Sequence, residues 1–283
     1  MKPAPFDYVR ATTLAEAHAV LAREGGDARV LAGGQTLIPM LSMRLARPKT
    51  LVDIMGIGAL ARVDPHGESL RIGAAVRQAR LLARPDLSAT VPLLALALPF
   101  VGHAQTRSRG TVCGSVAHAD PSAEIPLVLV ALGGGVELSS KRRRRVVPAE
   151  DFFTGMMSTA RDDDELVEAI RVPRRRAGDG FAFREFGRRH GDFAIVACAA
   201  AATHCGTRLA VGGVADRPVV RDLAELDGSA LHDALDGFAW DLDARDDLHA
   251  SAAYRRALVR RIGRDVIAEA RRRRIVRPRR CRA

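Results

Sequence analysis

The feature that most restricts the fold is a short apolar stretch, ARVLAG at 28–33, that runs into the glycine pair Gly33-Gly34. The stretch predicts a buried strand and the residues after Gln35 predict a helix, so the chain must turn sharply at the glycines. A strand that turns directly into a helix favours folds in which both element types occur together. Further elements are predicted nearby, at 6–9 (extended), 14–23 (helix) and 50–54 (strand).

The helix predicted at 14–23 has start and stop signals. Thr13 and Glu16 have the spacing of a capping box, and Gly25-Gly26 can end the helix with a left-handed residue. With the strands on either side, these signals predict a compact unit of about 55 residues at the N-terminal end.

Residues 56–175 form a second block of mixed elements. Strands are predicted at 69–76, 135–140 and 165–173, and helices at 76–84, 91–101 and 121–132. The segment PRRRAG at 173–178 breaks both periodicities and ends in glycine, so we place a domain boundary there. Beyond it we predict strands at 181–187, 193–203 and 208–214, and a helix-rich end that includes 252–273.

The charge distribution argues against a protein built to bind nucleic acid. The formal net charge is +11, but residues 255–283 alone hold thirteen arginines against Asp265 and Glu269, so the remainder of the chain is neutral. A neutral body with a basic tail does not present a phosphate-binding face. We interpret the tail as a solvated helix end and the run KRRRR at 141–145 as a solvated turn.

The sequence predicts a cytoplasmic protein without a metal of its own. No apolar leader follows Met1, and no stretch approaches the roughly 18 apolar residues of a membrane span. The cysteines form no CxxC pair, which predicts reduced thiols and neither zinc nor an iron–sulfur cluster in this chain. No Ser/His/Asp set stands out, so we predict no catalytic residues.

Two loops combine glycine with small or hydroxylated residues: Ala32–Thr36 and Gly110–Ser115. Backbone N–H groups near a helix start suit a phosphate, and glycine lets a ligand approach the backbone closely. Neither loop is a P-loop or a GxGxxG motif. Taken together, they are equally compatible with two unrelated turns and with a grip on the two phosphates of a dinucleotide. His103 and His118 flank the second loop and are expected to satisfy local backbone groups.

Four stretches carry a family resemblance; in chain order they are 32–54, 106–132, 183–200 and 209–219. They resemble the FAD-binding medium subunit of molybdenum hydroxylases, the group that includes carbon monoxide dehydrogenase and the bacterial xanthine dehydrogenases. The resemblance implies an α+β fold, with a two-subdomain FAD-binding domain of the vanillyl-alcohol-oxidase (PCMH) type before a smaller α+β domain. The implied division is an FAD-binding domain at 1–175 (subdomains at about 1–55 and 56–175), a CO dehydrogenase flavoprotein C-terminal-like domain at 178–275, and a basic tail at 276–283.

The resemblance also implies which residues bind FAD. The first glycine motif of the family matches Leu31, Ala32, Gly33, Gly34, Gln35, Thr36 and Leu37, and the second matches Thr111, Val112, Cys113, Gly114 and Ser115. Both motifs bind FAD in the family, chiefly at the pyrophosphate. The acidic positions that follow match Asp120 and Glu124, and Phe193, beside Asp192, is similar to an aromatic residue that lies over the flavin ring in some members.

Three positions depart from the usual second motif of the family, Ile-Arg-Asn-Arg-Gly-Thr-Ile/Val-Gly-Gly-Ser: Thr106, Ser108 and Cys113. Cys113 stands where the family has a glycine. A side chain there costs roughly 1–2 kcal/mol if the backbone needs a positive φ, and it obstructs FAD if the α-carbon must touch the cofactor. Cys113 therefore leaves open a degenerate paralogue that keeps the fold and no longer binds FAD.

The function implied by the resemblance is electron transfer. The chain would be the FAD-binding subunit of a molybdenum hydroxylase complex, expected to be a dimer of heterotrimers with a [2Fe-2S] small subunit and a molybdopterin-binding large subunit. Electrons from the clusters would pass through FAD to an external acceptor. Two further alternatives stay open: a stand-alone FAD-dependent oxidoreductase, and a nucleic-acid-binding protein that uses the basic tail.

Overall fold

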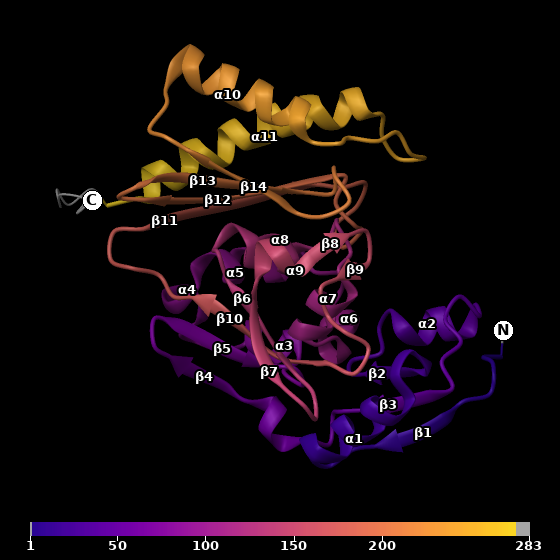
Figure 1. Ribbon diagram of the computed structural model, residues 1–283. Helices are drawn as coiled ribbons and strands as arrows, with labels where there is room; N and C mark the ends of the chain where they lie inside the picture. Colours follow the sequence, from indigo (N-terminus) through magenta and orange to yellow (C-terminus); the bar gives the residue numbers. More distant parts are fainter. Residues whose placement is uncertain (1, 276–283) are drawn as a thin grey trace.

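The computed structural model describes residues 2–275, and the basic tail predicted at 276–283 lies outside this range. The chain is arranged around three larger sheets and a two-stranded hairpin, with helices between and over them (Figure 1). The predicted mixture of helices and strands is confirmed. No helix within residues 2–275 combines the length and the apolar character needed to cross a membrane.

The N-terminal unit is a parallel three-stranded sheet in the order β1-β3-β2. Its elements are β1 (Asp7–Arg10), α1 (Leu14–Glu24), a 3₁₀ turn (Gly25–Asp27), β2 (Ala28–Leu31), α2 (Leu37–Ser42) and β3 (Thr50–Asp53). The Thr13 hydroxyl accepts a hydrogen bond from the Glu16 N–H at 3.2 Å, as the capping box predicts. The Glu16 carboxylate instead accepts from the N–H of Thr12, at 2.8 Å, one residue before the cap.

The middle unit is built on an antiparallel sheet in the order β4-β5-β10-β6-β7. Its strands are β4 (Val63–His66), β5 (Ser69–Gly73), β6 (Gly135–Ser139), β7 (Arg144–Pro148) and β10 (Leu166–Pro173), and a small hairpin joins β8 (Phe153–Gly155) to β9 (Ser158–Thr159). Its helices are a 3₁₀ turn (Gly58–Ala61), α3 (Gln78–Leu82), α4 (Leu87–Thr90), α5 (Pro92–Ala97), a 3₁₀ turn (Leu98–Phe100), α6 (Ala104–Arg109), α7 (Val112–His118), α8 (Glu124–Ala131) and α9 (Ala149–Phe152).

Two helices of this unit differ from their predicted extents. The helix predicted at 91–101 is divided into α5 and a 3₁₀ turn that contains Pro99, because proline lacks the N–H that a continuing helix needs. The helix predicted to begin at Pro121 begins at Glu124 instead. Asp120 does not cap it, because its carboxylate accepts the Ser122 N–H at 2.8 Å and closes a turn.

The basic run at 141–145 includes the exposed turn between β6 and β7, as predicted, and its arginines also pair with carboxylates of the acidic segment at 162–165. Arg142 pairs with Asp164 at 2.9 Å, and Arg145 pairs with Glu165 at 2.7 Å. The Glu165 side chain has no exposed surface, so the run neutralises a buried carboxylate. These ion pairs could not be predicted from the sequence. They form because β6 and β7 belong to the same sheet as β10, which follows the acidic segment, and the paired residues are distant along the chain.

The C-terminal unit is an antiparallel four-stranded sheet covered on one face by two helices. Its elements are β11 (Gly180–Phe186), β12 (Val196–Thr203), β13 (Gly206–Gly212), β14 (Val219–Leu223), α10 (Gly228–Asp241) and α11 (Ala252–Arg273). In Figure 1 α10 and α11 lie above this sheet, and α5 and α8 of the middle unit lie below it. The sheet is therefore shared between two layers of helices.

Strand β12 explains how helices can approach both faces of one sheet. Its sequence is VACAAAAT, and seven of these eight residues are buried. Ala197, Ala199 and Ala201 join the core of the middle unit, while the residues between them pack under α11. Small side chains keep both helix layers close to the strand, and alternation along the strand divides them between the two cores.

Candidate cofactor-binding site

The first glycine loop connects β2 to α2 and bends at Gly34. This residue has a φ of 70°, a left-handed conformation that glycine adopts without strain. Gln35 and Thr36 follow with exposed side chains, while Leu31 and Leu37 on either side are half-buried. The loop therefore exposes its polar residues and holds its ends by apolar contacts.

The second glycine loop differs from the prediction, because most of its residues belong to a helix. Thr111 caps α7, and its hydroxyl accepts the Gly114 N–H at 3.0 Å. A Cβ on Gly114 would lie only 2.7 Å from that hydroxyl oxygen, so the cap itself requires glycine. Val112 is fixed by its N–H, which donates to the Val76 carbonyl at 3.0 Å. Ser115 follows in the helix and is half-buried.

The structure brings the two loops into direct contact. A Cβ on Gly33 would collide with the carbonyl oxygen of Arg109 and lie 2.7 Å from the Gly110 α-carbon. Position 33 therefore has no room for a side chain, because the backbone of Arg109 and Gly110 packs against it. This contact joins the N-terminal and middle units into one surface at the predicted phosphate positions.

Cys113 lies in the core and does not project into the loop surface. It is 2 % exposed, and its thiol donates to the Ile72 carbonyl at 3.3 Å. Burial raises the pKa of this thiol to about 12, so it stays protonated and unreactive. Its place in the first turn of α7 gives it a helical backbone, so no positive φ is required. The strain and the obstruction considered for Cys113 from the sequence are both absent.

Two predicted acidic residues lie just beyond α7, in different environments. Asp120 is half-buried and closes the turn to Ser122. Glu124 is 5 % exposed, and burial, together with the charge of Asp120, raises the pKa of its carboxyl to about 7.

Glu185, on β11, was not predicted; burial and the charge of Glu124 raise the pKa of its carboxyl to about 8. Its Oε2 is buried without a hydrogen-bond partner, and nothing in the sequence sets this glutamate apart.

Asp192 and Phe193 line a separate cavity of about 590 Å³ between the middle and C-terminal units. Phe193 is 65 % exposed. The same cavity is lined by His103, which immediately precedes α6, and by Met156 at the tip of the β8–β9 hairpin. The predicted residues are thus divided: the two glycine loops lie together, whereas Pro121 and Ser122, which follow Asp120, line the Phe193 cavity, and Glu124 lies near Glu185 of β11.

A buried arginine that the sequence analysis missed holds the wall of this cavity. Arg255, on α11, is 5 % exposed, and its Nη1 donates to the carbonyls of Ile195 (2.7 Å) and Gly213 (2.6 Å). Its Nη2 pairs with Asp247 at 2.5 Å. Nothing distinguishes this arginine by sequence, because it stands in a helix that is rich in arginine.

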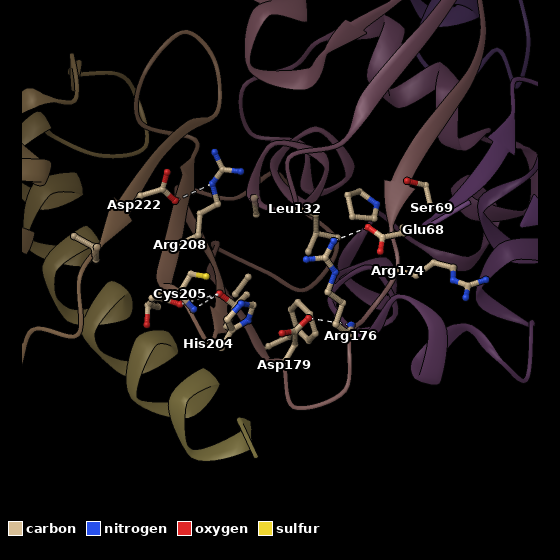
Figure 2. Close-up of a pocket in the computed structure, with 18 residues that line it drawn as sticks. Glu68, Ser69, Leu132, Arg174, Arg176, Asp179, His204, Cys205, Arg208 and Asp222 are labelled. Carbon is tan, nitrogen blue, oxygen red and sulfur yellow. Dashed lines mark hydrogen bonds and ion pairs between the residues drawn. The ribbon is translucent and has the colours of Figure 1, made fainter. Parts of the chain in front are cut away.

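A second cavity, of about 540 Å³, contains none of the predicted site residues (Figure 2). It lies between the segment that joins β10 to β11 and the turn between β12 and β13, on the side of the molecule away from the β8–β9 hairpin (Figure 1). Figure 2 shows Arg176 turned toward Glu68, with which it pairs at 2.5 Å, and Arg208 beside Asp222, at 3.2 Å. These arginines are neutralised by carboxylates, so the cavity has no excess positive charge for a phosphate. Within residues 2–275 no cluster of three or more His, Cys, Asp or Glu side chains is placed to hold a metal ion.

Comparison with known proteins matches both parts of the chain to described protein families. Residues 4–175 match the family described as "FAD binding domain in molybdopterin dehydrogenase", and residues 181–270 match "CO dehydrogenase flavoprotein C-terminal domain". The chain is 36 % identical to the 6-hydroxypseudooxynicotine dehydrogenase complex subunit alpha of Paenarthrobacter nicotinovorans, over 95 % of this chain and 96 % of that protein. It is 33 % identical to the carbon monoxide dehydrogenase medium chain of Hydrogenophaga pseudoflava, over 91 % and 94 %.

Solved structures show the same fold. A chain of carbon monoxide dehydrogenase from Hydrogenophaga pseudoflava superposes with a TM-score of 0.90 at 31 % identity, covering 97 % of this chain and 100 % of that one. A chain of quinoline 2-oxidoreductase from Pseudomonas putida 86 gives a TM-score of 0.89 at 32 % identity, covering 96 % and 99 %. The likeness therefore extends over all three sheets.

Proposed function

We propose a function that starts from one premise: the chain belongs to the family of FAD-binding medium subunits of molybdenum hydroxylases. It therefore carries the FAD-binding domain of an oxidoreductase family, as the sequence predicted. Its relatives are named as subunits of larger complexes, among them a dehydrogenase complex from Paenarthrobacter nicotinovorans and the medium chain of carbon monoxide dehydrogenase.

The finer proposal concerns the route of the electrons. We propose that the chain passes electrons from the [2Fe-2S] clusters of a small subunit to an external acceptor, while substrate is oxidised in a molybdopterin-binding large subunit of a dimer of heterotrimers. FAD supplies the redox chemistry when it is bound, and the protein supplies placement. A chain with this role needs no general acid or base of its own, which agrees with the lack of a predicted catalytic set.

The contact between the two glycine loops is the observation that supports this function best. Gly33 packs against the backbone of Arg109 and Gly110, so loops from two units form one surface with glycine at its centre. We propose that this surface holds the FAD pyrophosphate and that Asp120 and Glu124, as the resemblance implies, also contact FAD. We propose further that the flavin ring lies toward Phe193. The residues present fit such a cofactor, because backbone N–H groups and hydroxyls are suitable donors to phosphate oxygens.

The position of Cys113 argues against a degenerate paralogue. Its thiol faces Ile72 in the core, so it takes no space from a ligand at the loops. We keep the division into domains at 1–175 and 178–275 as a proposal; the two hydrophobic clusters, one centred on each part, support it. A cytoplasmic location is likewise proposed, and Cys113, Cys198 and Cys205, which form no disulfide with one another, are compatible with it.

The absorption spectrum of the purified protein tests the proposal directly. We expect the two-banded absorption of a flavin, bleached when the flavin is reduced. A colourless protein that also takes up no added FAD would contradict the proposal. A stand-alone FAD enzyme is separated from a subunit by assaying the isolated chain, because a stand-alone enzyme oxidises its own substrate, whereas the proposed subunit does so only with its partners.

A further inference from the structure

We propose that Arg107 is a positioning residue that makes helix α6 a fixed spacer between the glycine loops and the Phe193 loop, the segment 187–195 between β11 and β12. Its partners in this role are His103 and Gly191. The inference rests on the proposed function, because it concerns where the pyrophosphate and the flavin ring of one FAD would lie. His103 and Gly191 lie outside the glycine motifs; Arg107 matches an arginine of the second motif but is not among the residues predicted to bind FAD.

The Arg107 guanidinium donates hydrogen bonds to main-chain carbonyl oxygens. Its Nη1 donates to the carbonyl oxygens of Pro99 (3.2 Å), Val101 (3.0 Å) and Gly102 (2.9 Å), all in the turn that precedes α6. Gly102 has a φ of 50°, so this turn has a conformation that few other residues adopt. The guanidinium therefore fixes the turn against the helix that follows it.

The fixed turn ends at His103, whose ring packs against Gly191. A Cβ on Gly191 would lie 2.5 Å from His103 Cε1 and 2.7 Å from Nδ1, and the residue has a φ of 88°. Gly191 is thus required both by its backbone and by the ring beside it. Because Asp192 and Phe193 follow directly, the position of His103 determines where the Phe193 loop begins.

The other end of α6 reaches the phosphate positions. Arg109 is its last residue, and the backbone of Arg109 and Gly110 packs against Gly33 in the first glycine loop. A helix of six residues is about 9 Å long and rigid over that distance. One short helix thus has the phosphate loops at its C-terminal end and the Phe193 loop at its N-terminal end.

The Phe193 loop is also held from the C-terminal unit. Arg255 donates to the Ile195 carbonyl at 2.7 Å, two residues after Phe193. The loop is therefore fixed at both ends, by His103 through Gly191 and by Arg255 through Ile195. Phe193 stays 65 % exposed between these points and faces the cavity.

Two ligands separate positioning from direct phosphate binding. ADP has the adenosine and pyrophosphate of FAD but lacks the flavin, so we titrate the full-length chain with FAD and with ADP. We expect Arg107→Ala and Gly191→Ala each to weaken FAD binding about tenfold and to leave ADP binding within about twofold. The circular dichroism of bound FAD in the visible range should change as well. Gly58→Ala is the matched control, because a Cβ there meets nothing within 4 Å.

A second pair of variants guards against a folding defect in Arg107→Ala. His103→Ala removes an exposed ring, and Gly191→Ala should then weaken FAD binding less than it does in the unchanged protein. Equal losses for FAD and ADP, or no loss for either, would overturn the positioning role. Additive effects of His103→Ala and Gly191→Ala would overturn it too. If the unchanged chain binds neither ligand, the proposed function itself fails and the inference falls with it.

Discussion

Among single residues, Glu124 and Glu185 have strongly perturbed carboxyl groups. Burial is the main cause: it raises the pKa of Glu124 to about 7 and that of Glu185 to about 8. Glu124 opens α8 and Glu185 lies on β11, so both face the junction between the middle and C-terminal units. Each therefore holds a proton over part of the neutral range, and ionising it in the folded state is unfavourable.

The pH dependence of stability should report the titration of Glu124. Its pKa rises from an ordinary value of 4.5 to about 7 in the folded chain, a difference worth roughly 3 kcal/mol. The stability that protonated Glu124 contributes is present below pH 4.5 and is lost as the pH rises through 7. In the protein without FAD, Glu124→Gln should therefore raise the free energy of unfolding at pH 8, by up to roughly 3 kcal/mol, and change it little at pH 4.5.

Urea unfolding at several pH values measures this difference. The control is Glu150→Gln, which removes an exposed carboxylate paired with Arg208 and should cost less than about 1 kcal/mol. If the curves of free energy against pH for the unchanged protein and for Glu124→Gln run parallel from pH 4.5 to 8, Glu124 does not titrate as described.

Single residues also show what the sequence can and cannot reveal about the site. The turn at Gly33-Gly34 could be predicted, because a glycine pair between a strand and a helix marks a sharp bend, and Gly34 has a φ of 70°; its role in FAD binding came from the family resemblance and stays a prediction. Cys113 was misjudged, because the direction of its side chain depends on α7 beginning at Val112, and the sequence had placed the helix later. Glu185 and Arg255 were missed, because only the packing of distant elements buries them.

At the scale of elements, local signals located strands and helices better than their ends. The capping signal at Thr13 and the stop at Gly25 act within a few residues, so α1 was placed correctly. The start of α8 was placed three residues too early, because the Asp120 carboxylate accepts a hydrogen bond within a turn and does not cap the helix. The pairing of the run at 141–145 with Asp162, Asp164 and Glu165 was invisible, since it depends on which strands are neighbours in the sheet.

The pairing of β7 with the acidic segment should contribute measurably to stability. Burial opposes ionisation of Glu165, but hydrogen bonds from Arg145 and the Asp162 N–H, with the charges of Arg145 and Arg143, lower its pKa overall. Arg145→Ala leaves this carboxylate without its two-point partner, and we expect a loss of about 2 kcal/mol at pH 7. Because a lowered pKa gives stability that is lost as the pH falls, the difference should shrink below about pH 4.

Chemical denaturation at pH 7 and pH 3.5 checks this expectation. Arg142→Ala is the comparison: it removes an arginine that is 81 % exposed and pairs with Asp164, and should cost under about 1 kcal/mol. Similar losses for the two variants would mean that the buried position of Glu165 does not matter to the pair.

At the scale of the whole molecule, the contacts at β12 and at Gly33 help to join the units, and neither follows from periodicity. Strand β12 is built of small residues that divide between two cores, and alanines give no clear hydrophobic pattern from which this could be predicted. Gly33 brings the N-terminal unit against the end of α6. The sequence predicted both segments but not what lies against them, because the arrangement of units depends on contacts between distant parts of the chain.

The contact at Gly33 gives the sharpest prediction for the assembled molecule. A methyl group at this position collides with the Arg109 carbonyl and crowds Gly110, so Gly33→Ala must push the two loops apart. Overpacking of this kind typically costs about 1–3 kcal/mol. Since both loops are proposed to hold the pyrophosphate, FAD and ADP should both bind at least about tenfold more weakly to Gly33→Ala, whereas Gly191→Ala should weaken only FAD binding.

Gly237→Ala, where a Cβ meets nothing within 4 Å, serves as the control and should leave both affinities unchanged. Calorimetric titration with each ligand measures the effect, and unchanged affinities in Gly33→Ala would show that the two loops do not act as one surface.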